Sequence, residues 1–174
     1  MPCIKESLKS ETKVLIPEED VKTHVNVYSK GATALGKMLS NFYKFPIHTC
    51  DGDFLSVEGY WYWLSIPETH PRRDVLRKVY GLNAKKLGKE ILKEMDTEER
   101  RLDNDFEHKI LLAIWYKFRR NAHLITEELK DLPIEHYYNY GGKIIDCYDK
   151  YPWMLDGITK MRDILVQHPE KGTR

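Results

Sequence analysis

The chain has 174 residues, of which 28 are Lys or Arg and 27 are Asp or Glu, so its formal net charge is only +1. Proteins that hold duplex DNA through its phosphates usually carry a clear basic excess, and this balance disfavours that class. Hydrophobic residues make up 41% of the chain, a composition typical of globular proteins, and we expect one domain.

No segment is predicted to cross a membrane, because the longest apolar run, 110–116, is far shorter than the roughly 20 residues that a bilayer requires. The first residues lack the apolar core of a secretory signal. Cys3, Cys50 and Cys147 are odd in number and far apart. We therefore expect a cytoplasmic protein with free thiols, and the absence of CxxC and HExxH motifs predicts no metal and no other cofactor.

The first third of the chain predicts an arm, a strand, a helix and a hairpin. Residues 1–24 are polar and broken by prolines, which indicates a peripheral arm, and 25–168 form the domain. Val25–Tyr28 alternates like a strand, and 32–39 follows as a helix. The segment 45–55 is typical of a small β-hairpin, because Asp51-Gly52 supplies the positive φ of a tight turn.

Helices dominate the rest of the sequence. Ser56 is a good N-cap for an aromatic-rich helix over 57–64, which Pro67 must end. The further helices are predicted at 72–80, 83–95, 105–121, 123–129 and about 152–166. An extended segment at 134–140 leads to a Gly141-Gly142 turn. The expected fold is mainly α, or α+β with a few short strands: a single compact helical domain with a small hairpin near its N-terminal third.

A phosphate-binding loop is suggested by Gly31–Lys37, which satisfies GxxxxGK between a predicted strand and a helix. Met38 stands where a P-loop needs Ser or Thr to hold magnesium. The chain also offers few strands for a parallel sheet. A P-loop NTPase is therefore a distant alternative, and a helix start that attracts phosphate is favoured.

Several short motifs occur in a telling order: Leu39–Tyr43, Pro46-Ile47, Asp51–Phe54, Ser56-Val57-Glu58, Ala84–Lys89, the 106–129 helices, and 153–165 with Met161 and Arg162. In this order and spacing the chain resembles the NADAR superfamily of YbiA-like N-glycosidases. The resemblance covers roughly residues 25–166. It implies hydrolysis of an N-glycosidic bond to a phosphorylated ribose, as in phosphoribosyl aminopyrimidines, or removal of ADP-ribose from a guanine base. The implied partners are such small molecules, with ADP-ribosylated DNA as a further candidate.

Glu58 suits this chemistry. Cleavage at the ribose C1 passes through an oxocarbenium-like centre and needs a proton donor for the departing nitrogen. In an aromatic helix, burial is expected to raise the pKa of this carboxyl into a useful range. The alternative role of Glu58 is to complement the helix N-terminus.

Other residues are candidates for substrate binding. Asn41 can hold ribose hydroxyls or serve as a turn residue. The aromatic candidates for stacking a base, each of which can instead belong to the core, are Phe42, Trp61, Tyr62 and Trp153. Lys30 and Lys37 can face phosphate or simply be solvated. Gly141 and Gly142, in place of the family's Trp-Gly-x-Gly loop, permit a close backbone approach.

One position departs from the family pattern. The resemblance implies a lysine seven residues after the glutamate, which forms a Schiff base with opened ribose, but this chain has Ser65 there. A hydroxyl cannot form an imine. Lys37 is the first candidate to replace this amine, and Lys85 and Lys86 come second. The alternatives are direct water attack, or a catalytically silent module that binds ADP-ribose or a nucleotide.

Overall fold

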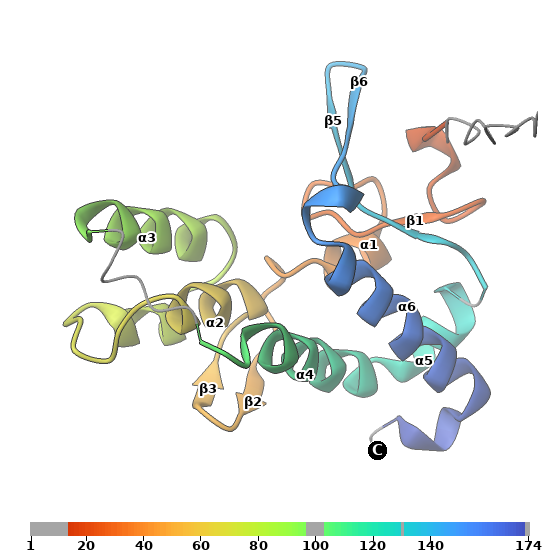
Figure 1. Cartoon of the computed structure of the whole chain (residues 1–174). Coiled ribbons are helices and arrows are strands. Elements are labelled where there is room, and N and C mark those ends of the chain that lie inside the picture. Colours follow the sequence, from red (N-terminus) through yellow and green to blue (C-terminus); the bar gives the residue numbers. More distant parts are fainter. Residues whose placement is uncertain (1–13, 97–102, 130, 173–174) are drawn as a thin grey trace, which may run out of the picture.

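The computed structural model describes residues 14–96, 103–129 and 131–172 (Figure 1). Residues 1–13, which hold most of the predicted arm, lie outside this part. The helices are α1 (Ala34–Leu39), α2 (Val57–Leu64), α3 (Gly81–Glu94), α4 (Phe106–Arg120), α5 (Ala122–Leu124) and α6 (Pro152–Gln167). The shorter turns are η1 (Pro17–Glu19), η2 (Arg73–Lys78), η4 (Ile125–Leu129), η5 (Tyr148–Lys150) and η6 (Pro169–Lys171).

The strands in the described residues are short and pair two by two. They are β1 (Val25–Asn26), β2 (Ile47–Thr49), β3 (Gly52–Phe54), β4 (Ile134–Glu135), β5 (Tyr137–Tyr140) and β6 (Lys143–Asp146). β1 pairs with β4 in parallel, whereas β2–β3 and β5–β6 are antiparallel hairpins. The β5–β6 hairpin projects from the body of the molecule (Figure 1). The predicted mainly helical α+β class is confirmed.

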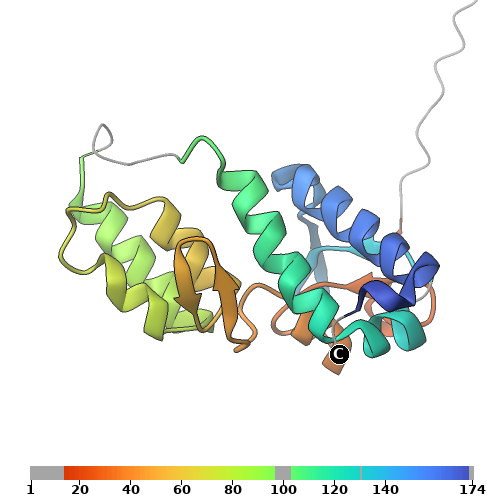
Figure 2. The ribbon, with the colours of Figure 1, turned by 90° about the horizontal axis from the view of Figure 1, so that it is seen from below.

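α4 is the central helix. Figures 1 and 2 show it between a group formed by α2, α3 and the β2–β3 hairpin and a second group that contains α1, β1 and α6. Its predicted apolar stripe is buried, with Ile110, Ile114 and Phe118 fully inaccessible to solvent. α2 and α6 both pack against it. Burial of such side chains contributes about 1.5–3 kcal/mol each, so α4 holds the two groups together.

Local signals in the sequence explain where the elements near the site begin. The Ser56 hydroxyl accepts a hydrogen bond from the Gly59 N–H at 3.1 Å and caps α2 as predicted. Thr33 caps α1 in the same way through the Gly36 N–H, at 3.0 Å. Gly52 adopts a φ of +108° in the β2–β3 turn, the conformation for which glycine is best suited. These caps fix the first turns that carry candidate site residues.

Some predicted elements differ from those observed. The segment 134–140 is divided between β4 and β5, because His136 leaves one pairing and Tyr137 enters another. Lys143–Asp146 forms strand β6, which was not predicted from the sequence. The predicted helix 72–80 is a 3₁₀ turn, η2, and 123–129 includes a π-helical turn, η4.

The GxxxxGK segment does not sit in the setting of a P-loop. The parallel pair β1–β4 has two residues in each strand, and α1 has six residues. Gly36 packs against the backbone oxygen of Asn26, which a Cβ at this position would overlap. Gly36 therefore allows α1 and β1 to pack closely against each other.

Residues just before β1 pack against the domain. The His24 Nε2 and the Tyr137 hydroxyl are 2.8 Å apart, and the Asp20 carboxylate accepts a hydrogen bond from the Asn26 N–H at 2.9 Å. Both Asp20 and His24 are buried. Cys50 and Cys147 are free thiols, while Cys3 lies outside the described residues. Within the described ranges, every helix is too short or too polar to span a bilayer.

Candidate functional site

A cavity of about 370 Å³ lies where α2 and α3 face the segments around β1 and β5. Its walls combine one carboxylate, several amines and many aromatic rings. The charged lining residues are Glu58, Lys30, Lys85, Lys89 and Lys150. The aromatic ones are Tyr28, Phe42, Trp61, Tyr62, His136, Tyr138, Tyr140 and Tyr151. Such a surface suits an anionic ligand that carries a flat ring.

Glu58 lies in the first turn of α2 and is only 9% exposed. Its backbone N–H donates to the Asn41 carbonyl at 3.0 Å, which ties the start of α2 to the segment after α1. Burial raises the pKa of the Glu58 carboxyl to about 7, although Lys85 and Lys89 act in the opposite direction. Near neutral pH this carboxyl therefore exists in both protonation states and can donate a proton.

This burial predicts a pH-dependent difference in stability between the wild type and Glu58→Gln. Folding raises the Glu58 pKa from 4.5 to about 7, so wild-type stability falls as pH rises through this interval and levels off above it. The amide has no such titration. Between pH 5 and pH 8 we expect the free energy of unfolding to shift by about 2–3 kcal/mol in favour of the variant. Urea unfolding at both pH values measures this shift, and parallel pH curves for the two proteins would contradict it.

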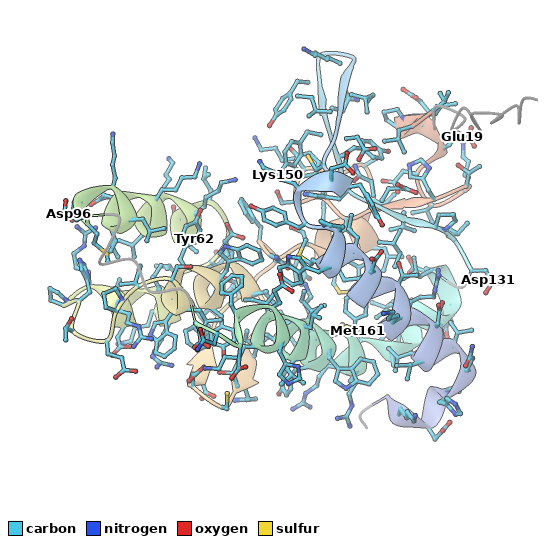
Figure 3. The ribbon with its side chains drawn as sticks, in the orientation of Figure 1. Glu19, Tyr62, Asp96, Asp131, Lys150 and Met161 are labelled. Atoms are coloured by element: carbon cyan, nitrogen blue, oxygen red, sulfur yellow. The ribbon has the colours of Figure 1, made fainter. Side chains whose placement is uncertain are left out.

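The amines come from different parts of the chain. Lys85 and Lys89 lie on α3, and both act electrostatically on Glu58. Lys85 is partly buried, with its Nζ 5.4 Å from the centre of the Phe42 ring. Lys30 follows β1, and Lys150 lies at the base of the β5–β6 hairpin (Figure 3). Four cations around one carboxylate leave the cavity with a net positive charge, which favours a phosphorylated ligand.

The position of Asn41 depends on a buried lysine. The Lys117 Nζ donates to the carbonyls of Leu39 and Ser40 at 2.8 and 2.9 Å and so joins α4 to the end of α1. Complete burial lowers the pKa of Lys117 to about 7. The Asn41 amide lines the cavity and its Nδ2 lies 3.5 Å from the Met154 sulfur. Lys117 therefore supports the segment that carries Asn41.

Two aromatic residues of α2 face the cavity from well-packed positions. Trp61 is stacked on Trp153, with ring centres 5.9 Å apart, and the rings of Phe106 and Tyr151 lie nearly perpendicular to it. Tyr62 lies on the side of α2 that faces α3 (Figure 3), against Gly88, where a Cβ would overlap its ring. This packing leaves the two rings little freedom to move.

Six predicted site residues come together in the cavity: Glu58, Lys30, Asn41, Phe42, Trp61 and Tyr62. The other four do not line it. Lys37 is on the exposed side of α1. Gly141 and Gly142 form the exposed turn of the projecting hairpin, and Gly141 lines a neighbouring cavity that also includes Lys30. Trp153 lies behind Trp61 as a packing partner.

Three cavity residues of one strand-like segment were not predicted from the sequence. His136, Tyr138 and Tyr140 all line the cavity, and they alternate as side chains on one face of an extended segment do. This spacing of two was the available signal.

Within the described ranges, no three His, Cys, Asp or Glu side chains are grouped so that they can hold a metal ion. Ser65, which stands where the resemblance implies a lysine, caps the end of α2, and its hydroxyl donates to the Trp61 carbonyl at 3.2 Å. It does not line the cavity.

Comparison with known proteins supports the fold. No protein-family model and no curated protein matches the sequence. Among solved structures, the chain is similar to the NMR structure of the E. coli protein YbiA, with a TM-score of 0.60 and 17% sequence identity. The match covers 87% of this chain and 90% of that chain. The chain therefore has a NADAR-like fold, as the order of its motifs predicts.

Proposed function

We propose that this protein is an N-glycosidase that hydrolyses the bond between a base nitrogen and C1 of a phosphorylated ribose or ADP-ribose. The observation that carries the proposal is Glu58, a carboxyl buried in a cavity lined by amines and aromatic rings. ADP-ribosylated guanine and phosphoribosyl aminopyrimidines are the candidate substrates.

The proposed reaction uses the proton of Glu58. As the bond between C1 and the base breaks, its electron pair moves to the base nitrogen, and protonation of this nitrogen makes the base a better leaving group. A carboxyl with a pKa of about 7 is protonated in about half of the molecules at neutral pH and is still acidic enough to donate its proton. After the transfer, the carboxylate stabilises the positive charge that develops at C1.

The rest of the cavity accounts for substrate binding in this proposal. The lysines attract the phosphate, while Phe42, Trp61 and the tyrosines offer faces on which a base or sugar can pack. The Asn41 amide has both donor and acceptor groups for ribose hydroxyls.

Lys85 is the amine that we propose in place of the family lysine. It reaches the cavity from α3, whereas Ser65 is engaged with the α2 backbone and Lys37 lies outside. In an imine route, the Lys85 ammonium first loses a proton to solvent, and its nitrogen bonds to C1 as the base leaves with the proton of Glu58. The ring C1–O bond then opens as the ring oxygen takes a proton from that nitrogen, which gives the protonated imine, and water frees the sugar and the lysine.

The test is direct incubation of the protein with ADP-ribosylated guanine DNA and, separately, with phosphoribosyl aminopyrimidines. Chromatography with mass detection identifies free ADP-ribose or ribose phosphate. We expect turnover of one substrate class. No release from either class would contradict the proposed activity.

A second candidate function is a silent module that binds ADP-ribose or a nucleotide, and the location of Ser65 outside the cavity favours it. The lysine-rich cavity suits binding without turnover equally well. Calorimetric titration with ADP-ribose, run beside the assay, separates the two functions, because a silent module binds the ligand and releases no product.

A further inference from the structure

His136 is held in one orientation at the cavity wall, between strands β4 and β5. Its Nδ1 lies 2.7 Å from the Val27 carbonyl oxygen. A carbonyl oxygen can only accept a hydrogen bond, so the proton of the neutral ring must be on Nδ1. Nε2, on the other side of the ring, then carries a lone pair.

The surroundings of His136 leave this lone pair available. Within the described ranges no hydrogen bond to Nε2 is found, and the Tyr138 ring lies nearly perpendicular to the imidazole with centres 5.2 Å apart. Among the charged groups near the ring, Lys150 and Lys85 lower its pKa and Asp146 raises it. Burial has the largest effect and lowers the pKa, so the ring is neutral at physiological pH.

His136 and Glu58 line the same cavity but favour opposite proton-transfer roles. Near neutral pH the Glu58 carboxyl is protonated in about half of the molecules, whereas the His136 ring is neutral. When the environments of two titratable groups move their pKa values in opposite directions, one group commonly acts as the acid and the other as the base of a reaction. Hydrolysis requires both roles.

We propose that His136 is the catalytic base, whose Nε2 takes a proton from the water molecule that attacks C1. The inference rests on the proposed function. In the balanced step, the water oxygen bonds to C1, the bond from C1 to the base nitrogen breaks, and that nitrogen takes its proton from Glu58. The imidazolium then loses its proton to solvent and Glu58 regains one, so the net reaction adds one water. Hydrolysis of an imine on Lys85 uses the same transfer from water.

Two amide variants separate this role from a structural one. His136→Asn places an amide nitrogen near the position of Nδ1 and keeps the donor to Val27, but it removes Nε2. His136→Gln places its amide near Nε2 and loses the Val27 donor. We expect both to lose about 100-fold or more in kcat with KM within about threefold. Only the Gln variant should also melt at a lower temperature, because it alone lacks the bond to Val27.

The dependence of kcat/KM on pH distinguishes a catalytic role of His136 from a structural one, because the loss of a structural contact alone would not change the shape of this profile. In the wild type, kcat/KM should fall on the acidic side as His136 is protonated, and on the basic side as Glu58 loses its proton. We expect the acidic limb to disappear in His136→Asn while the basic limb remains. An Asn variant within about threefold of wild type, with an intact acidic limb, overturns the base role and leaves the proposed function standing.

Failure of the proposed function has a different signature, since the wild type then releases no product from either substrate and the base role fails with it. A further measurement does not depend on how the variants fold. In ¹⁵N NMR spectra of the wild-type imidazole near pH 7.5, we expect the proton on Nδ1 and a shift of Nε2 on addition of ADP-ribose. A proton on Nε2, or an Nε2 signal that ADP-ribose leaves unchanged, overturns the proposal.

Discussion

Replacement of Glu58 by Gln is expected to lower kcat by about 10²–10⁴-fold and to change the dissociation constant for ADP-ribose by no more than about tenfold. The amide keeps the shape of the side chain and can still form hydrogen bonds, but it has no acidic proton to transfer and no charge to place near C1. The backbone bond from residue 58 to Asn41 does not involve the side chain and should survive. Initial rates and calorimetric titration measure the two quantities.

Glu107→Gln is the matched control for this experiment. Glu107 lies in the first turn of α4, as Glu58 does in α2, but it is exposed and does not line the cavity. Its variant should keep the wild-type rate. A Glu58→Gln enzyme that turns over at the wild-type rate would remove Glu58 from the mechanism.

Borohydride added during turnover is expected to trap a covalent sugar adduct on Lys85, because reduction converts a reversible imine into a stable amine. The intact mass should rise by that of the reduced sugar, and peptide mapping should place the adduct on α3. In Lys85→Arg the cation is retained but no imine can form. We expect complete loss of the adduct and a fall in kcat of about 100-fold or more.

Variants of two lysines that lie outside the cavity serve as controls. Lys86 is the next residue on α3 and is exposed outside the cavity, and Lys37 lies on the exposed side of α1. The variants Lys86→Met and Lys37→Met should still form the adduct. An adduct mapped to Lys37 would contradict the assignment of the imine to Lys85. Active turnover without any adduct would exclude the imine and indicate direct water attack on C1.

Much of the fold follows from local signals in the sequence. Ser56 and Pro67 bracket α2, Asp51-Gly52 forms the predicted turn, and the stripe along α4 identifies the central helix. These signals act over a few residues, which is why they can be found without a structure. The parallel pairing of β1 with β4 joins segments more than 100 residues apart, and neither strand is long enough to reveal its partner by pattern alone.

The candidate site was predictable only in part, for the same reason. Glu58 and Asn41 lie in a motif-rich segment, and they do meet at the cavity. The choice among the lysines required tertiary structure, since helical spacing does not say which face of α1 or α3 meets α2. Lys117 could not be predicted at all, because a lysine within an apolar stripe gives no indication that it is buried on two backbone carbonyls.

The most direct measurement of the central claim is a time course of both products in one reaction, with wild-type protein and with Glu58→Gln. For the wild type, the leaving group, which is unmodified DNA or the free aminopyrimidine, should appear in equal molar amounts with ADP-ribose or ribose phosphate, and over many turnovers. The variant should release both products about 10²–10⁴-fold more slowly while still binding ADP-ribose. Binding by the wild type with no release of either product would contradict an N-glycosidase site and identify the cavity as a binding module.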